Sequence, residues 1–374
     1  MFVTAINIIA MFCTLSCDNK QTDDGSPLYE AALNGEKLSW DSISGYISMD
    51  RMIPVKATND THIADISKAT LFGHHIYIKD RMGSSVFLAD LETGEVTTFF
   101  THQGKANNEY ISISDIGLDN KENLYVYDSD SRKVLCYDKN GKHLFTNQAS
   151  TGECIAVKKN GDYAIACNYF NADTCVAMYD KKGTPDGTIV NLEKRPPFLL
   201  SSMMNISSSD DGYFFTQLFD NTIYQIKDGK RRAFLRIDFG DKNINKEELF
   251  QMDSKEFLSS YLPHTDEVLS LDYPQKYKDL LFVRTYRDDN LLYDIKTNKL
   301  FSLSNLNNPY KMLFRTPVFL DSEGDFFVII DDSTVRNALL PYIKAKGTNE
   351  PIFDSVLQTG DTPADYWILL GHVL

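Results

Sequence analysis

A short strand pattern with an aromatic residue at its centre recurs along the chain. The six copies are centred on Tyr77, Tyr125, Tyr163, Phe214, Phe282 and Phe327. Polar turn residues precede most copies, at 120–123, 160–162, 210–212 and 322–324. Turn chemistry directly before a strand fixes where strand pairing begins. This internal repeat predicts an architecture built from similar units that pack against one another.

A second marker follows each of the first five copies. It is a strand that runs into a tight turn, and the turn residues are Gly94, Gly141, Gly183, Gly229 and Asn298. Glycine and asparagine adopt the positive φ that tight hairpin turns require. These residues lie 47, 42, 46 and 69 positions apart. A period of 40–50 residues with several short strands is typical of propeller blades, and a β-sandwich is the alternative.

We therefore predict an all-β fold, a six-bladed β-propeller over residues 39–374. The long last interval predicts one helical insertion, at about 241–277, between blades four and five. Within it, apolar residues recur at near-helical spacing from Asn245 to Leu262, and Pro263 ends the run. We expect one helix on a face of the propeller, with aromatic residues that serve packing rather than a ligand platform.

Closure of the ring requires one more strand, because an open ring leaves strand edges exposed. Residues 45–57 contain strand-like segments but belong to no complete blade. We expect them to complete the last blade. Its other strands are predicted at Phe326–Ile330 and Tyr366–Val373.

The first seventeen residues are mostly apolar and shorter than a membrane-spanning helix requires. They end in Leu15-Ser16-Cys17, which resembles the end of a bacterial lipoprotein signal peptide. We predict a signal at 1–17, lipidation of Cys17, and a polar tether at 18–38 that is too poor in apolar residues to fold. A buried N-terminal helix or strand is the alternative.

The remaining cysteines of the mature body lie within forty residues. They are Cys136, Cys154, Cys167 and Cys175. An oxidising compartment permits disulfides. A hairpin centred on Asn171 would place Cys167 opposite Cys175, which predicts a disulfide between them. Two buried free thiols are the alternative.

Charge disfavours one class of partner. The chain has 52 acidic and 38 basic residues, a net charge of -14. Such a surface repels polyanions, so nucleic acid is not expected as a partner.

Residues 123–144 resemble an NHL-type propeller repeat, in which an aromatic strand, an aspartate and a turn with glycine recur. The chain from about residue 40 to 374 resembles the Bacteroidetes-type six-bladed β-propeller lipoproteins. The landmarks are the lipoprotein start, the segments HIYIKD and DNTIYQIKDG, Arg236–Gly240 before the insertion, and Gly104, Glu109 and Tyr110 in QGKANNEY. The resemblance implies the fold and implies no particular reaction.

No nucleophile motif, zinc motif or phosphate-binding loop is present. Four groups of polar residues could bind a metal ion or act as acid and base, and for each we prefer a structural role: His74-His75, Asp128-Ser129-Asp130, Asp288-Asp289 and Asp331-Asp332. We predict no catalytic residue, no metal ligand and no cofactor, with calcium left open. Ligand-binding residues should be polar groups at the ends of the innermost strands, near the mouth of the central channel.

These inferences predict a lipoprotein of the cell envelope, held at the outer membrane or its periplasmic face by its lipid anchor alone. It would act as a binding or scaffolding module for a glycan, a peptide or an envelope protein. The alternative is a calcium-dependent hydrolase or lyase of the lactonase or sugar-processing kind. A third function is that of an assembly component of an outer-membrane complex.

Overall fold

The computed structural model describes residues 26–58, 61, 63, 65–81, 85–100, 102–166, 174–191, 204–348, 350–359 and 363–374. The lipidation site predicted at Cys17 and the signal at 1–17 lie outside these ranges. So do Cys167 and the side chain of Cys175, and the last described residue pair of that hairpin is Ala166 with Val176. In the described ranges, no helix is long and apolar enough to cross a membrane.

Four sheets are separate from one another, and each runs antiparallel from its first strand to its fourth. The first sheet consists of β7 (Asp115–Leu118), β8 (Leu124–Asp128), β9 (Lys133–Tyr137) and β10 (His143–Gln148), and the second of β11 (Cys154–Val157), β12 (Tyr163–Ala166), β13 (Thr174–Tyr179) and β14 (Pro185–Asn191). The third sheet contains β15 (Ile206–Ser209), β16 (Gly212–Thr216), β17 (Thr222–Lys227) and β18 (Lys230–Asp238). The fourth sheet consists of β19 (Leu271–Tyr277), β20 (Leu280–Thr285), β21 (Asn290–Asp294) and β22 (Lys299–Ser302).

The fifth sheet has eight strands. Their order is β23 (Val318–Leu320), β24 (Asp325–Asp331), β25 (Tyr366–Val373), β2 (Ile47–Ala57), β6 (Glu95–Phe100), β5 (Val86–Asp90), β4 (His75–Asp80) and β3 (Ile66–Phe72). Its two antiparallel halves meet where β2 runs parallel to β6. Only two residue pairs join them there, Lys56 with Glu95 and Ala57 with Val96.

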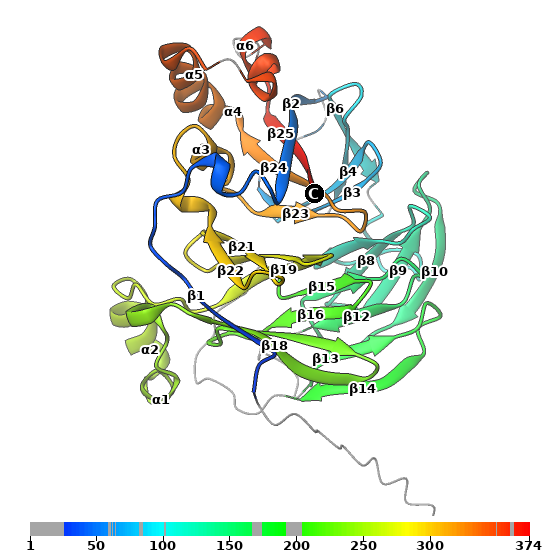
Figure 1. Cartoon of the computed structure of the whole chain (residues 1–374). Helices are drawn as coiled ribbons and strands as arrows, with labels where there is room; N and C mark the ends of the chain where they lie inside the picture. Colours follow the sequence, from blue (N-terminus) through cyan, green and yellow to red (C-terminus); the bar gives the residue numbers. More distant parts are fainter. Residues whose placement is uncertain are drawn as a thin grey trace, which may run out of the picture.

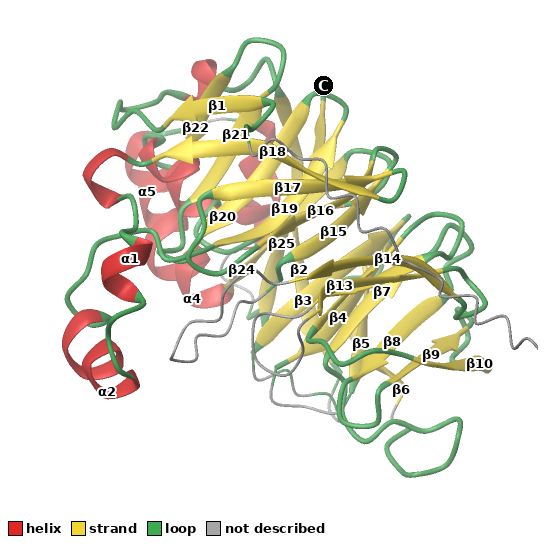
Figure 2. Ribbon diagram, turned by 90° about the horizontal axis from the view of Figure 1, so that it is seen from below, coloured by secondary structure: helices red, strands yellow, loops and turns green. Residues whose placement is uncertain are grey.

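The sheets are arranged in a ring (Figures 1 and 2). The first strands β3, β7, β11, β15, β19 and β23 are neighbours in that order, and β23 returns to β3. The fold is therefore all-β and propeller-like. The expectation of six separate blades is met in part, because the structure has four separate sheets and one eight-stranded sheet.

Both repeat markers correspond to structure. The aromatic copies form the second strands β4, β8, β12, β16, β20 and β24. The second marker forms the third strands β5, β9, β13, β17 and β21. The five predicted turn residues have φ between +55° and +83°. The left-handed backbone that the repeat predicted is thus confirmed at every one of these turns.

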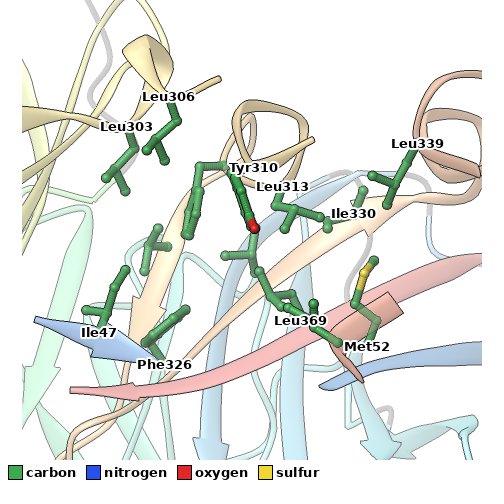
Figure 3. Packing of buried hydrophobic residues seen from close by; sticks show 14 of the residues in the cluster. Ile47, Met52, Leu303, Leu306, Tyr310, Leu313, Phe326, Ile330, Leu339 and Leu369 are labelled. Atoms are coloured by element: carbon green, nitrogen blue, oxygen red, sulfur yellow. The ribbon is translucent and has the colours of Figure 1, made fainter. Parts of the chain in front are cut away.

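Closure occurs where the sequence predicted it. Strand β2 pairs antiparallel with β25 from Ile47 opposite Val373 to Val55 opposite Tyr366, and β24 pairs with the other edge of β25. Side chains from these strands pack into one buried cluster with residues of the C-terminal half (Figure 3). Ile47, Met52, Phe326 and Leu369 contribute to it. Apolar burial between the two ends of the chain therefore stabilises the closed ring.

The insertion between β18 and β19 is helical, but it is not one helix. It contains the short helices α1 (Lys246–Leu249) and α2 (Ser254–Glu256), and a π-helical turn (Phe257–Tyr261) follows α2. The break occurs because the Asp253 side chain accepts a hydrogen bond from the Glu256 N–H and starts a new helix. Leu249 and Phe257 are buried against Phe219, so the apolar residues serve packing. Strand β19 occupies the last part of the segment expected to be insertion.

A second helical region interrupts the eight-stranded sheet and was not predicted. It joins β24 to β25 and comprises α4 (Asp332–Thr334), a π-helical turn (Val335–Leu339), α5 (Leu340–Lys346), a 3-10 turn (Pro351–Phe353) and α6 (Asp354–Thr359). The Asp331 carboxylate caps α4 by accepting from the Thr334 N–H at 2.7 Å. The short helix α3 (Tyr310–Leu313) and the 3-10 turns Trp40–Ser42, Gly240–Lys242 and Leu303–Asn305 complete the helical elements.

Part of the predicted tether is folded. Strand β1 (Tyr29–Ala32) lies parallel to β18, with Tyr29 opposite Leu235, and extends that sheet to five strands. Ala31 is buried and Tyr29 packs against Phe234. The expectation of an unstructured tether over the whole of 18–38 is therefore wrong. The segment covers the outer edge of β18, which would otherwise present unpaired backbone groups.

We predict that Gly371→Ala destabilises the closed ring. A Cβ at Gly371 in β25 would meet the backbone oxygen of Ser48 and the ring of Phe326, both part of the closing contact. Overpacking of this kind costs about 1–3 kcal/mol of unfolding free energy. Gly45→Ala is the matched control because nothing lies within 4 Å of its added Cβ. Urea denaturation should show a lower midpoint for the first variant alone, and equal midpoints would contradict the packing.

Candidate functional site

A cavity of about 860 Å³ occupies the centre of the ring. It is lined by the carboxyl ends of all six first strands and by the turns that follow them. The lining segments are 68–73, 116–120, 155–160, 206–211, 275–279 and 319–323, with Met204 in addition. A volume of this size falls within the range of small-molecule sites.

The mouth of the cavity is formed by the polar turns that precede the repeated aromatic strands. Asn120, Asn160, Asp210 and Glu323 come from four different turns and all line the cavity. These residues lie at the ends of the innermost strands, where ligand-binding residues are expected, and their binding of a ligand stays a prediction. A repeat therefore positions chemically different side chains around one opening.

Ion pairs connect the turns across the mouth. Lys276 Nζ lies 2.5 Å from Asp211 Oδ2, which joins β19 to the turn after β15. Lys159 Nζ lies 3.0 Å from Glu323 Oε1 and 3.8 Å from Asp210 Oδ1. The hydrogen bond with Glu323 raises the pKa of Lys159, and the same contact lowers the pKa of Glu323. Both groups are therefore charged at neutral pH.

Two aspartates at the mouth hold turns. Asp119 accepts from the N–H groups of Lys121 at 2.8 Å and Asn123 at 3.0 Å. Asp321 accepts from the N–H groups of three residues, 323–325, at 2.8–2.9 Å. Burial outweighs these bonds and raises the pKa of Asp321 to about 6. These carboxylates are committed to backbone groups, whereas Lys159 is bound only by exposed carboxylates.

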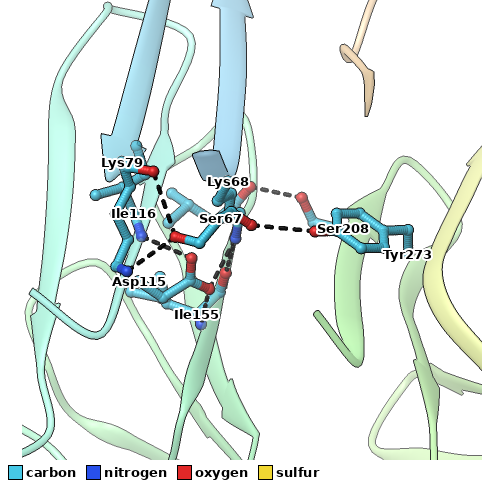
Figure 4. A network of polar contacts seen from close by, with 9 residues as sticks. Ser67, Lys68, Lys79, Asp115, Ile116, Ile155, Ser208 and Tyr273 are labelled. Carbon is cyan, nitrogen blue, oxygen red and sulfur yellow. Dashed lines mark hydrogen bonds and ion pairs between the residues drawn. The ribbon is translucent and has the colours of Figure 1, made fainter. Parts of the chain in front are cut away.

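A buried polar network lies at the end of the cavity where Lys68 and Ile155 belong to the lining, and we call it the floor. Figure 4 shows its contacts. Lys68 Nζ lies 2.8 Å from Asp115 Oδ2 and donates to the Ile155 carbonyl at 2.9 Å. The Ile155 N–H donates to the same Asp115 oxygen at 2.7 Å. Three neighbouring first strands, β3, β7 and β11, are thereby joined. Because both charges are almost fully buried and paired, the network is rigid.

A bulge in β19 adds a tyrosine to this floor. Tyr273 and Pro274 oppose a single residue of β20, and Tyr273 has φ +55°, a strained conformation for a bulky residue. Pro274 suits a bulge because it has no N–H to donate. The bulge directs the Tyr273 hydroxyl across the ring to donate to the Ser67 carbonyl at 3.0 Å. Burial strongly raises the pKa of Tyr273, so the phenol stays protonated.

Around the cavity wall, side chains also form hydrogen bonds with the backbone groups at the inner edges of the first strands. Ser208 Oγ donates to the Val157 carbonyl at 2.5 Å. Gln275 spans the gap to β23, where it donates to the Val318 carbonyl at 2.7 Å and accepts from the Leu320 N–H at 2.8 Å. These backbone groups have no neighbouring strand on the channel side, and an unpaired buried group is costly. The inner strands are thus joined by side chains rather than by ladder bonds.

Lys79 lies behind the floor on β4 and is buried. Its ammonium group donates to Ser67 Oγ at 2.9 Å and to the Asp80 carbonyl at 3.4 Å. Burial lowers the pKa of Lys79, although Asp115 nearby opposes the shift. Lys79 does not line the cavity, so we assign it to the support of the floor.

The four polar groups weighed from the sequence have structural roles. His75 Nδ1 lies 2.7 Å from Glu122 Oε1, while the adjacent His74 is half-exposed. Asp128 is buried and accepts from the Ile111 N–H at 2.7 Å, which holds the loop before β7.

The remaining aspartates contact basic or capping partners. Asp288 pairs with Arg284 at 2.6 Å, and Asp289 accepts from Ser302 Oγ at 2.7 Å. Asp332 accepts from Trp367 Nε1 at 2.9 Å. None of these aspartates lines the central cavity.

In the part of the chain that the structure describes, no three His, Cys, Asp or Glu side chains are placed to hold a metal ion. The described cysteines Cys136 and Cys154 are buried and form no disulfide, and burial raises the pKa of each thiol well above its ordinary value. They are therefore unreactive packing residues. The disulfide between Cys167 and Cys175 stays a prediction.

Comparison with known proteins identifies the family. The model of a domain of unknown function, DUF4934, matches residues 33–354. The chain belongs to the DUF4934 family. None of the curated proteins matches it.

Two solved structures that resemble the chain support the fold. One is a protein of Bacteroides fragilis that is described as exported, with 15% identity, a TM-score of 0.67, and coverage of 92% of this chain and 99% of that one. The other is a member of the DUF4221 family from Bacteroides vulgatus, with 8% identity, a TM-score of 0.50, and coverage of 88% and 99%. At these identities the likeness concerns the fold alone.

The sequence analysis did not single out Lys68, Asp115, Tyr273 or Lys159. A signal was present for two of them. Asp115 is a charged residue at the start of a buried strand, and Tyr273-Pro274 places a proline inside a strand, which indicates a bulge. The other two are lysines: the role of Lys68 depends on which strands are neighbours in the ring, and that of Lys159 on which turns meet across it.

We predict that Asp115→Ala destabilises the protein by about 3–5 kcal/mol, because it leaves the buried Lys68 ammonium without its partner. The control is Lys296→Ala, which removes the pair with Asp279 at 2.8 Å, where Lys296 is 74% exposed. The control should change the unfolding free energy by less than about 1 kcal/mol. Urea unfolding measures both variants. A similar small loss in each would show that the floor is not a buried network.

Proposed function

We propose that the protein is a six-bladed propeller that binds a small polar ligand in its central cavity. Each half of the eight-stranded sheet then counts as one blade, since only two residue pairs connect the halves. The closed order of the six first strands supports this count. The helical elements lie outside the ring of first strands and do not line the cavity.

One observation carries the proposal: a central cavity has a buried polar network at one end and a polar mouth at the other. The network consists of mutually bonded side chains and backbone groups, and the mouth consists of turns with charged and amide groups. A concave cavity with a few placed polar groups is the usual form of a small-molecule site. Among the described residues that line it, none has the geometry of a nucleophile with an adjacent base, which supports binding as the first function to test.

The cell-envelope location belongs to the same proposal. We propose that Cys17 is lipidated and holds the propeller at the outer membrane or its periplasmic face, where the ligand would be a glycan or peptide fragment. The support is the sequence at 1–17 and the exported description of the Bacteroides fragilis structure.

We predict that ligand binding is lost when the cavity is filled. A screen of glycan and peptide fragments on the full-length protein should identify a binder by calorimetry. Thr70→Trp introduces a large side chain into the cavity lining and should weaken that binding at least about tenfold, or 1.4 kcal/mol. Thr98→Trp places the same residue on the exposed outer strand β6 and should leave affinity unchanged.

Two results would contradict the cavity as the site. Equal affinity of both tryptophan variants would place binding elsewhere on the surface. No binder in the screen, together with turnover in hydrolase or lyase assays, would favour the enzymatic alternative.

We predict that Cys17→Ser abolishes lipid attachment. Cells grown with an alkyne fatty acid should label the unaltered protein and not the variant, and the variant should move from the membrane fraction to the soluble fraction. The matched control is Cys136→Ser, which changes a buried thiol of the folded body and should retain the label. Labelling of the Cys17 variant would contradict the anchor.

A further inference from the structure

Lys159 and Glu323 form a bridge across the mouth of the cavity. Lys159 follows β11 and Glu323 follows β23. In the ring of first strands, β15 and β19 separate these two strands on one side, and β7 and β3 separate them on the other. The 3.0 Å ion pair therefore joins opposite sides of the opening, and Asp210 approaches the same ammonium at 3.8 Å.

The bridge is weak. Glu323 is 72% exposed and Lys159 is 37% exposed. Ion pairs in such positions contribute about 0–1 kcal/mol, because water screens them and both side chains lose freedom. The buried Lys68–Asp115 pair of the floor stands in contrast. Opening the mouth costs little, whereas opening the floor costs much.

The two partners are not equivalent when the bridge opens. The backbone of Lys159 is held by a bond from the Asn120 N–H to the Lys159 carbonyl at 3.1 Å, and the residue lines the cavity. The Glu323 N–H is likewise bound, by Asp321 at 2.8 Å, and Glu323 also lines the cavity, but its carboxylate is 72% exposed against 37% for the Lys159 side chain. Loss of the bridge therefore frees the carboxylate into solvent and leaves the Lys159 ammonium group at the mouth, where it attracts negative charge.

We infer that Lys159 is a ligand-binding residue that selects small ligands carrying a carboxylate, and that this carboxylate replaces Glu323 as its partner. The inference rests on the proposed function of the cavity. Glu323 acts as an internal competitor for the ammonium group: it weakens the binding of anionic ligands, and neutral or cationic molecules carry no group that could replace it.

Access to the cavity can be measured without a known ligand. Thr70→Cys places a thiol in the cavity lining. The full-length variant is treated with two methanethiosulfonates of similar size, one with an anionic sulfonatoethyl group and one with a cationic trimethylammonioethyl group. Intact mass against time gives both rates, and protein without the new thiol gives the background.

Glu323→Gln should increase the anionic rate by about threefold relative to the cationic rate, the size expected for an exposed charge pair. Lys159→Gln should remove the preference for the anionic reagent. Lys246→Gln is the matched control: it removes a 2.9 Å pair with Asp220 outside the cavity lining and should change neither rate.

The outcomes separate the two claims. Rates that are measurable but independent of charge in all variants would overturn the role of Lys159 and leave the cavity accessible. No modification by either reagent in any variant would show that the cavity is closed, and the proposed function would fail with it.

Discussion

The inner edges of the sheets impose the constraint on which this structure depends. Each first strand lacks a partner on the channel side, so its backbone groups must find side chains or water. Neighbouring sheets supply these side chains. Asp115 and Lys68 bind the edge of β11 at Ile155, and Gln275 binds both a carbonyl and an N–H of β23. The hydrogen bonds that satisfy each edge therefore also fix the positions of the sheets around the ring.

The same constraint separates the floor from the mouth. Near the amino ends of the first strands, buried side chains fill the centre, and Tyr273 reaches across it from a strained bulge. Toward the carboxyl ends the strands pass into turns whose charged residues are exposed. The buried charge pair is strong because the dielectric constant around it is low, so breaking it requires much free energy. The ion pairs among the exposed turns are weak because water and dissolved ions screen them. The ring is thus held firmly at the floor and loosely at the mouth.

The sequence predicted the features that depend on local chemistry. Positive φ at Gly94 or Asn298 is a property of a hairpin turn, and the aromatic-centred pattern around Tyr125 or Phe327 is a property of one strand. The closing pair of β2 and β25 was also predicted, because an incomplete blade at one end of the chain requires its complement at the other. The helices between β24 and β25 were missed, since short capped helices leave little periodicity. The contact of Lys159 with Glu323 depends on ring geometry that no local pattern encodes.

Closure by the two ends of the chain links the cavity to the whole fold. The floor joins β3, β7, β11 and β19, and the mouth joins turns that follow β11, β15 and β23, so no single sheet contains the site. The cavity is lined by all six first strands, and β2 closes the ring of sheets by pairing with β25. A ligand that binds the cavity must therefore stabilise the closed ring as a unit, by an amount set by its concentration relative to its Kd. Because the Lys159–Glu323 bridge is weak, a ligand can replace it and stabilise the ring without breaking the buried network of the floor.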